Sequence, residues 1–81
     1  MQEMGLHELE NGEQATIIRL HTRGSMRRRL LDLGFVEHGT VTCVGRAPSG
    51  DPLAFWVRGA VIALRREDCQ PIIVRRGCSW D

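Results

Sequence analysis

The chain has 81 residues, of which 42% are hydrophobic and 26% charged, and its formal net charge is +1. These proportions are those of an ordinary globular protein and exclude a disordered tail. All eleven basic residues are arginine, which excludes lysine Schiff bases and the P-loop lysine, and a chain this short has little room for a deep catalytic cleft. We therefore expect a binding module and no enzyme.

The location of the protein is predicted from its apolar stretches and its cysteines. The longest purely apolar stretch, 60–64, is far shorter than the roughly 20 residues that span a bilayer, and the first residues lack a basic secretory region. Cys43, Cys69 and Cys78 form an odd set without C-x-x-C spacing, so neither a disulfide framework nor a zinc ribbon is predicted. We expect a cytoplasmic protein that does not insert into the membrane.

The first 20 residues predict a short element and a strand. Residues 6–9 are followed by Asn11 and Gly12, a pair typical of a turn because it readily adopts positive φ. Residues 15–20 contain several β-branched side chains, which favour a strand. Ile17 and Ile18 are adjacent and break strict alternation, so a bulge is expected there.

A helix is predicted over residues 26–33. Ser25 is placed to cap its N-terminus, and Gly34 is the expected C-terminal stop. Leu31 falls on the outer side of this helix, whereas one apolar face collects Met26, Leu30 and Leu33.

The second half of the chain predicts short strands. These cover residues 40–44, 53–57, 60–64 and 72–74, with a loop over 46–52 and a single helical turn over 65–69. Alternation turns Trp56 outward and assigns to the inner face Val41, Cys43, Leu53, Phe55, Val57, Ile62 and Leu64. The predicted fold is mainly β: a small barrel of about five short strands with one helix inserted after the first strand. We expect a single domain over 1–81, with its core in about 6–74 and a frayed tail over 75–81.

The order and spacing of several short motifs resemble one family from end to end. They are Arg-Arg-Leu-Leu-Asp-Leu-Gly-Phe at 28–35, Gly-Thr-Val at 39–41, Arg-Ala-Pro-Ser-Gly-Asp-Pro-Leu at 46–53, Val-Arg-Gly at 57–59 and Ile-Ala-Leu-Arg-Arg at 62–66. Over roughly residues 6–74 the chain resembles the FeoA family. His38 and Cys69 depart from the family pattern, which usually has proline and alanine there.

The resemblance implies an SH3-like barrel and a non-enzymatic accessory role in bacterial ferrous iron uptake. It further implies that the chain binds the cytosolic side of a FeoB-type iron permease and modulates it. No cofactor is implied. Weak association between copies of the chain is left open by the sequence.

A metal site held by the protein is not predicted, although the resemblance to an iron-transport family invites one. His7, His21 and His38 lack the spacing of a ligand set, and only His7 and Glu10 are three residues apart. An iron-carrying chaperone is a third alternative, which metal analysis would decide. No nucleophile with an adjacent base is recognisable either, so no catalytic residue is expected.

The arginine pairs and triplet raise an alternative function, a nucleic-acid or repressor-associated SH3-like interaction module. Guanidinium groups bind phosphates, and small barrels bind single strands through stacked aromatic side chains. Only Trp56, Trp80 and Phe35 are available for stacking, and the near-zero net charge gives a weak field. No nucleic-acid partner is therefore expected.

Two outward apolar residues supply a candidate protein interface. Leu31 lies beside Arg27 and Arg28 on the helix, and Trp56 shares an outward strand face with Arg58. Tryptophan and arginine dominate the energetics of protein interfaces. We predict Leu31 and Trp56 as apolar anchors, the three arginines as their polar or charge partners, and the loop 47–52 as scaffold or rim.

Overall fold

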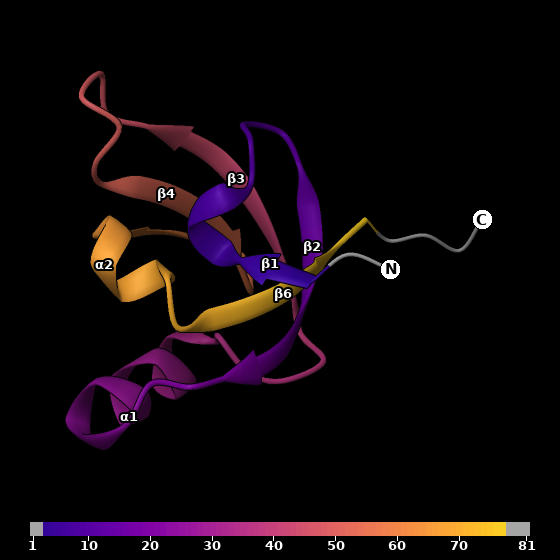
Figure 1. Ribbon diagram of the computed structural model, residues 1–81, viewed down its shortest axis with the longest axis vertical. Coiled ribbons are helices and arrows are strands. Elements are labelled where there is room, and N and C mark those ends of the chain that lie inside the picture. Colours follow the sequence, from indigo (N-terminus) through magenta and orange to yellow (C-terminus); the bar gives the residue numbers. More distant parts are fainter. Residues whose placement is uncertain (1–2, 78–81) are drawn as a thin grey trace.

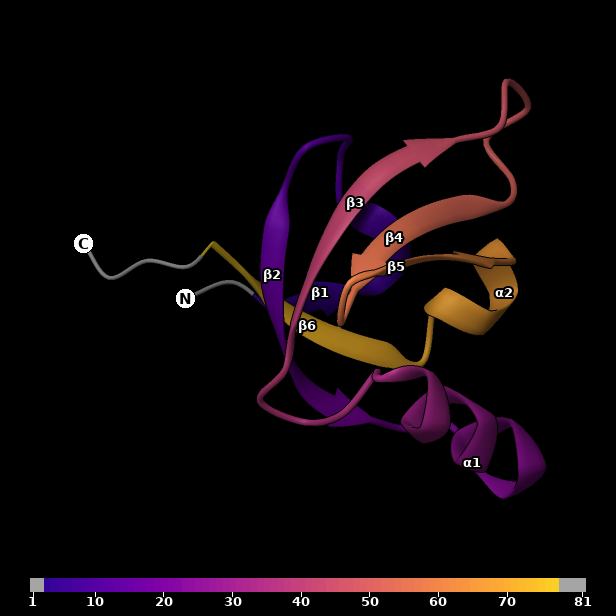
Figure 2. The same cartoon turned by 180° about the vertical axis from the view of Figure 1, so that it is seen from behind.

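Six antiparallel strands form the body of the protein in the computed structural model, which describes residues 3–77 (Figure 1). The strands are β1 (Glu3–Gly5), β2 (Gln14–Leu20), β3 (Thr40–Arg46), β4 (Leu53–Val57), β5 (Ala60–Leu64) and β6 (Ile72–Arg76). Their spatial order is β1-β6-β2-β3-β4-β5 in one sheet. Figure 2, the view from behind, shows this sheet curving so that β6 crosses below β4 and β5. The predicted mainly β fold is confirmed, with one strand more than expected.

The additional strand, β1, and the full length of β6 were not predicted. Glu3, Met4 and Gly5 pair with Arg75, Val74 and Ile73. This pairing joins the first strand to the last, and β1 has no β-branched residue that would indicate a strand in the sequence. The prediction of a frayed tail from residue 75 is wrong for Arg75 and Arg76, which pair with Thr16 and Ala15 of β2. The rest of that predicted tail, from residue 78, lies outside the described residues.

The predicted bulge in β2 is confirmed. The register between β2 and β6 shifts between Ile17 and Arg19, so Ile18 is the additional residue. A second bulge, in β3, shifts the register with β4 between Cys43 and Gly45. Each bulge increases the local twist of its strand, which favours the curvature of a small barrel.

Helix α1 (Gly24–Leu33) begins two residues earlier than predicted. Arg23 occupies the N-cap position without a side-chain hydrogen bond, so the prediction of Ser25 as the cap is wrong. Gly34 ends the helix at φ +111°, in the left-handed region that glycine adopts without a Cβ penalty. The inward face is as predicted: Leu30 is fully buried, and Met26 and Leu33 pack against the core.

Strands β4 and β5 form a hairpin closed by the two residues Arg58 and Gly59. Both have positive φ, 52° and 81°, as the type I′ turn of a two-residue hairpin requires. This turn fixes the register, so that Val57 pairs with Ala60 and Trp56 lies directly opposite Val61.

The interior is entirely apolar among the described residues, with no buried polar or charged side chain. Phe35 and Phe55 meet edge to face at its centre, with ring centroids 6.4 Å apart. All the predicted inward strand positions are buried except Ile62, which is partly buried against the same core. The short elements η1 (Leu6–Glu8) and α2 (Arg66–Cys69) pack against each other beside this core. Within residues 3–77 no helix has the length and apolarity needed to cross a bilayer.

Candidate functional site

The outer surface of β3, β4 and β5 exposes large apolar side chains, which we call the apolar face: Val44, Trp56 and Val61. Their exposed fractions are 47%, 48% and 60%. Trp56 points outward because Phe55 and Val57, its neighbours along β4, fill the core. Val61 lies across the hairpin from Trp56, and the Cβ atoms of such opposed residues approach to about 5 Å. The two side chains therefore form a continuous apolar surface.

Leu31 belongs to helix α1 and Arg58 to the hairpin turn, and these two elements meet at Gly34. A Cβ placed on Gly34 would lie 2.8 Å from Cδ of Arg58 and 2.9 Å from Cγ1 of Val57. The aliphatic part of Arg58 thus packs directly over the C-terminal end of α1. Leu31 lies three residues before Gly34 and is 36% exposed. Arg58 consequently stands at the junction between the strand that carries Trp56 and the helix that carries Leu31.

Arg27 and Arg28, adjacent on α1, have different environments. Nη1 of Arg27 donates hydrogen bonds to the carbonyl oxygens of Leu20 at 2.8 Å and Thr22 at 3.4 Å. These bonds connect α1 to the end of β2 and to the segment between β2 and α1. Arg28 is exposed, and no hydrogen bond to its side chain occurs within the described residues. Arg27 therefore has a structural role, and Arg28 retains its guanidinium group for a partner.

The predicted loop over 46–52 supports α2. Oδ1 of Asp51 accepts a hydrogen bond from the backbone N–H of Arg66, at 2.9 Å, and so satisfies a free donor at the start of α2. Arg46 belongs to β3, and its guanidinium donates to the carbonyl of Leu9. Both contacts are internal, and the role of the loop as scaffold or rim stays a prediction.

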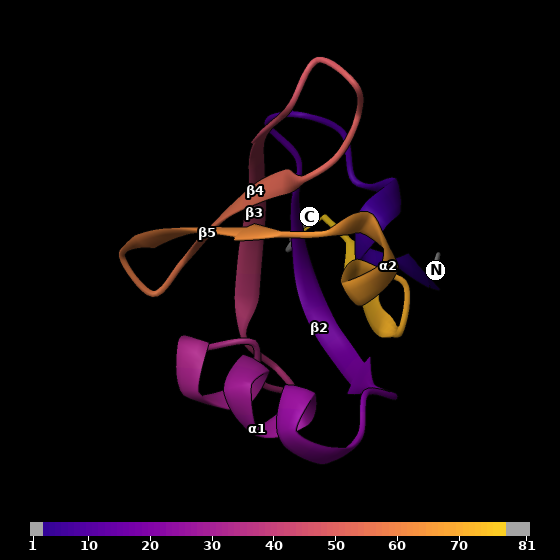
Figure 3. The same cartoon turned by 90° about the vertical axis from the view of Figure 1, so that its left-hand side faces the viewer.

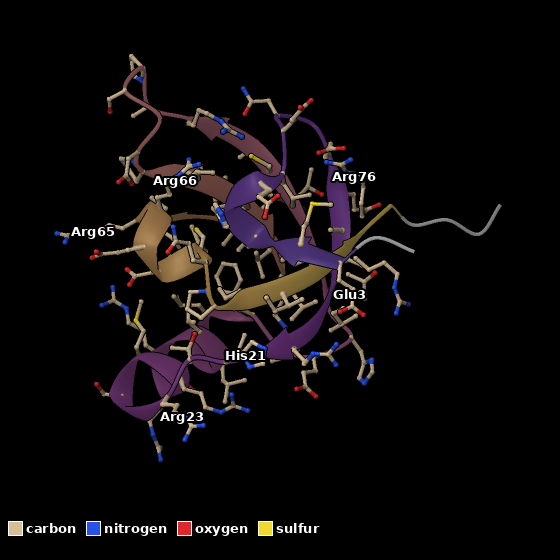
Figure 4. All side chains as sticks on the ribbon, in the orientation of Figure 1. Glu3, His21, Arg23, Arg65, Arg66 and Arg76 are labelled. Atoms are coloured by element: carbon tan, nitrogen blue, oxygen red, sulfur yellow. The ribbon has the colours of Figure 1, made fainter. Side chains whose placement is uncertain are left out.

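The opposite side of the molecule carries ion pairs and forms what we call the salt-bridged side. Arg19 contacts Glu3 at 2.9 Å, and Arg76 contacts Glu13 at 2.8 Å. Figure 4 shows Glu3 and Arg76 near the paired end of β1 and β6, far from Arg65 and Arg66 beside α2. Exposed pairs of this kind contribute little to stability, about 0.2–1 kcal/mol, but they occupy the charges of Arg19 and Arg76. Arg75 on β6 is exposed and has no ion pair within residues 3–77.

The histidines do not come together. No three His, Cys, Asp or Glu side chains within residues 3–77 are placed to hold a metal ion. His38 has a positive φ of 74°, a value that a proline ring, fixed near −65°, cannot adopt. The backbone at this turn therefore suits the residue that the chain has there and would not suit proline.

Cys69 is fully buried, as expected for a small core residue. Its burial, followed by the negative charges of Asp68 and Asp51, raises the pKa of its thiol from 9.0 to about 12. The thiol is therefore neutral and unreactive at physiological pH. It offers neither a nucleophile nor a thiolate ligand.

Two members of the apolar face, Val44 and Val61, were not singled out from the sequence. The signal for Val61 was present, because a two-residue Arg-Gly turn places it opposite Trp56. Phe35, considered as a stacking platform, is buried in the core and cannot stack on a base. Trp80 and Cys78 lie outside the described residues.

Taken together, the exposed groups offer a surface for binding a protein. An apolar centre with arginine at its edge is the composition of a protein interface.

Comparison with known proteins agrees with this view of the molecule. Residues 4–76 match the model of the FeoA domain family. A curated relative in Porphyromonas gingivalis, an Fe(2+) transport protein A/Fe(2+) transporter FeoB fusion protein, is 44% identical over 71 residues. The match covers 88% of this chain and only 8% of that relative, so the chain spans a small part of the relative's length.

Solved structures share the fold. A FeoA-like protein from Clostridium acetobutylicum superposes with a TM-score of 0.86 at 28% identity, covering 100% of this chain and 94% of the other. FeoA from Stenotrophomonas maltophilia in complex with zinc gives a TM-score of 0.73 at 33% identity, covering 89% of each chain. That protein is described as an SH3 domain protein and is linked to the activation of bacterial ferrous iron transport.

Proposed function

This chain belongs to the FeoA domain family, and from that premise we propose that it is a single, non-enzymatic, cytoplasmic accessory domain of ferrous iron uptake. In this role it binds the cytosolic side of a FeoB-type permease and modulates transport. The observation that carries the proposal is the relative in which the matching segment and a FeoB transporter form one chain. Covalent fusion keeps two modules at a high effective concentration, so it favours those that act in contact.

The apolar face is the docking surface in this proposal. Trp56 is its anchor, Val61 extends the surface next to Trp56, and Leu31 on α1 is a second anchor outside the face. A tryptophan that is half exposed in the free protein can bury a large area at a modest entropic cost, because its side chain has only two rotatable bonds. Arg58 and Arg28 lie at the rim, where they select a partner of complementary charge.

The test is a calorimetric titration of the purified cytosolic domain of the permease with this protein. Trp56→Ala should weaken binding about 30-fold, as expected for an interface hot spot of about 2 kcal/mol. Leu31→Asp should also weaken binding, because it places a charge in an apolar contact. Gln14→Ala, an exposed position on β2, is the matched control and should bind like the original protein. Unchanged affinity in both Trp56→Ala and Leu31→Asp would rule out this surface.

A further inference from the structure

Strand β5 ends the sheet with one side unpaired. Within residues 3–77 its only neighbour is β4, and the hairpin register places Val57 opposite Ala60 and Phe55 opposite Ile62. In a two-residue hairpin the pair that closes the turn exchanges both hydrogen bonds, and alternate pairs do so from there on. The backbone N–H and C=O groups of Val61 and Ala63 therefore point away from β4, toward the free side.

This edge lacks the features that usually protect an edge strand. Residues 60–64 contain no charge and no proline, and both Val61 and Ala63 are exposed. The opposite edge of the sheet is different, because β1 has only three residues and carries Glu3. An apolar edge of five residues with free hydrogen-bonding groups is suited to pairing with another strand.

A hollow next to β5 provides space for an added strand. Its volume is about 530 Å³, within the usual range for ligand pockets. Figure 3 shows β5 facing the viewer with α1 below it. The hollow lies between these elements and α2, and its lining includes Met26 and Arg29 of α1, Ala63 and Leu64 of β5, and Glu67 and Asp68 of α2.

The charges at the two ends of β5 indicate what the partner strand is like. Arg58 precedes the strand, and Arg65 and Arg66 follow it, with Arg65 extending away from the body in Figure 4. Across the hollow, Arg29 adds a third arginine near the α2 end, against the two acids Glu67 and Asp68. Nη1 of Arg65 lies 3.9 Å from Oε2 of Glu67, and Asp51 is a third acid at this end, so the charges there balance. The Arg58 end of the edge is therefore the positive one, whereas its centre is apolar.

A second copy of the chain fits this edge poorly. When the whole strand pairs with its copy in antiparallel register, Ile62 faces Ile62, and Arg58 of each copy falls beside Arg66 of the other. Like charges placed opposite each other destabilise strand pairing. The arginines thus disfavour self-pairing, and Arg58 favours a different chain with an acid beside it.

We infer that β5 binds an extended segment of a partner protein as a seventh strand, and that this segment has an apolar centre and an acidic residue at the end that lies beside Arg58. The inference deepens the proposed function and rests on it to the extent that the docked permease supplies the segment. Hydrogen bonds to Val61 and Ala63 would provide affinity. Side chains of the added strand would extend the apolar face beyond Val61, and the acid beside Arg58 would select the segment.

A synthetic peptide tests the edge without the permease. The probe is a fluorescein-labelled peptide with five alternating valine and threonine residues between two aspartates at each end. Its binding is measured by fluorescence anisotropy. We expect saturable binding and protection of the Val61 and Ala63 amides from hydrogen exchange. Ala63→Pro removes an outward N–H without removing a bond to β4, so it should weaken peptide binding at least tenfold. Ala63→Ser keeps the N–H, and its affinity for the peptide should stay within twofold of that of the original protein.

Charge exchange provides a second measurement that does not depend on the folding of a proline variant. Arg58→Glu should weaken binding of the aspartate-flanked peptide about two- to fivefold and strengthen binding of the same peptide flanked by lysines. The inference is overturned if the aspartate-flanked peptide does not bind at millimolar concentration. It is also overturned if binding is unaffected by both Ala63→Pro and Arg58→Glu.

The permease domain separates this inference from the proposed function. Binding of that domain that is lost in Trp56→Ala and unchanged in Ala63→Pro would overturn strand addition and support the docking proposal. Peptide binding at β5 together with no binding of the permease domain would support the edge site and overturn the docking proposal.

Discussion

The salt-bridged side and the apolar face belong to the same sheet but have surfaces of opposite character. On β1, β2 and β6, Arg19 and Arg76 are paired with glutamates. On β3, β4 and β5, the exposed surface carries Trp56 and Val61, and β5 has a free edge. One side has two arginines in ion pairs and ends in the three-residue edge strand β1, whereas the other leaves apolar area and the longer edge of β5 open.

This difference shows which surface is adapted to contact. Scattered exposed apolar residues are normal, but here they lie opposite each other across one hairpin and next to an unpaired edge. We expect stability to depend little on them, since the core beneath contains sixteen buried apolar side chains among residues 3–77. The comparison therefore separates residues that hold the fold from residues that are available to a partner.

The largest effect is expected in the core that both sides share. Phe55→Ala removes the edge-to-face contact with Phe35 and leaves a cavity, which should lower the free energy of unfolding by about 3–5 kcal/mol. Urea denaturation followed by circular dichroism measures this loss. Val61→Ala, on the apolar face, is the control and should change stability by less than about 0.5 kcal/mol. A large loss in Val61→Ala would mean that the apolar face is part of the folding core.

The next effect concerns the joint between α1 and the β4–β5 turn. Gly34→Ala adds a Cβ at φ +111° and 2.8 Å from Arg58, so it should lower stability by about 2–3 kcal/mol. Gly50→Ala has a similar φ of +94° but open space around it, so about 1 kcal/mol is expected from the conformational strain alone. Thermal unfolding of the two variants measures the difference between their losses of stability. Equal losses would show that Arg58 does not pack on α1.

Cys69 should make stability fall at alkaline pH. Its folded-state pKa of about 12 lies above the ordinary value of 9.0, so above pH 9 the thiol ionises in the unfolded chain and stays protonated in the folded one. Its contribution to the free energy of unfolding is therefore fully present below pH 9 and is lost as pH rises toward 12. The expected slope is about 1.4 kcal/mol for each pH unit in that window. Urea denaturation at pH 8 and pH 10 measures it, and Cys69→Ala should have a smaller slope. The same slope in both proteins would assign the pH dependence to other groups.

The smallest effect distinguishes two adjacent arginines. Arg27→Ala removes hydrogen bonds to the carbonyls of Leu20 and Thr22 and should cost about 1 kcal/mol of stability. Arg28→Ala should leave stability within about 0.5 kcal/mol and weaken binding of the permease domain. Denaturation and calorimetry on both variants provide the comparison. The reverse pattern would exchange the structural and binding roles that we give them.

Much of the fold could be predicted from the sequence because its signals are local. Alternation over 53–57 and 60–64 correctly separated Phe55 from Trp56, and Gly34 correctly marked the end of α1. Features that depend on distant residues were missed. The strand β1 exists because β6, some 70 residues later, provides its partner. Ser25 was mistaken for a cap because the helix begins at Gly24, which left the serine inside the first turn.

The candidate site could be predicted only in part. An outward tryptophan between two core residues can be recognised from the sequence, as Trp56 was. The internal hydrogen bonds of Arg27 could not be, since the carbonyls that it contacts become acceptors only once the chain has turned between β2 and α1. The exposed edge of β5 is likewise a property of strand order, which alternation does not specify.

The partner is expected to bind the side of the molecule that carries the apolar face. The ¹⁵N-labelled protein can be titrated with the unlabelled cytosolic domain of the permease while its amide chemical shifts are monitored. The largest shifts are expected at Trp56, at Val61 and at the C-terminal end of α1 around Leu31, with little change at Arg19 and in β1. Shifts concentrated on the salt-bridged side, or no shifts at all, would contradict this expectation.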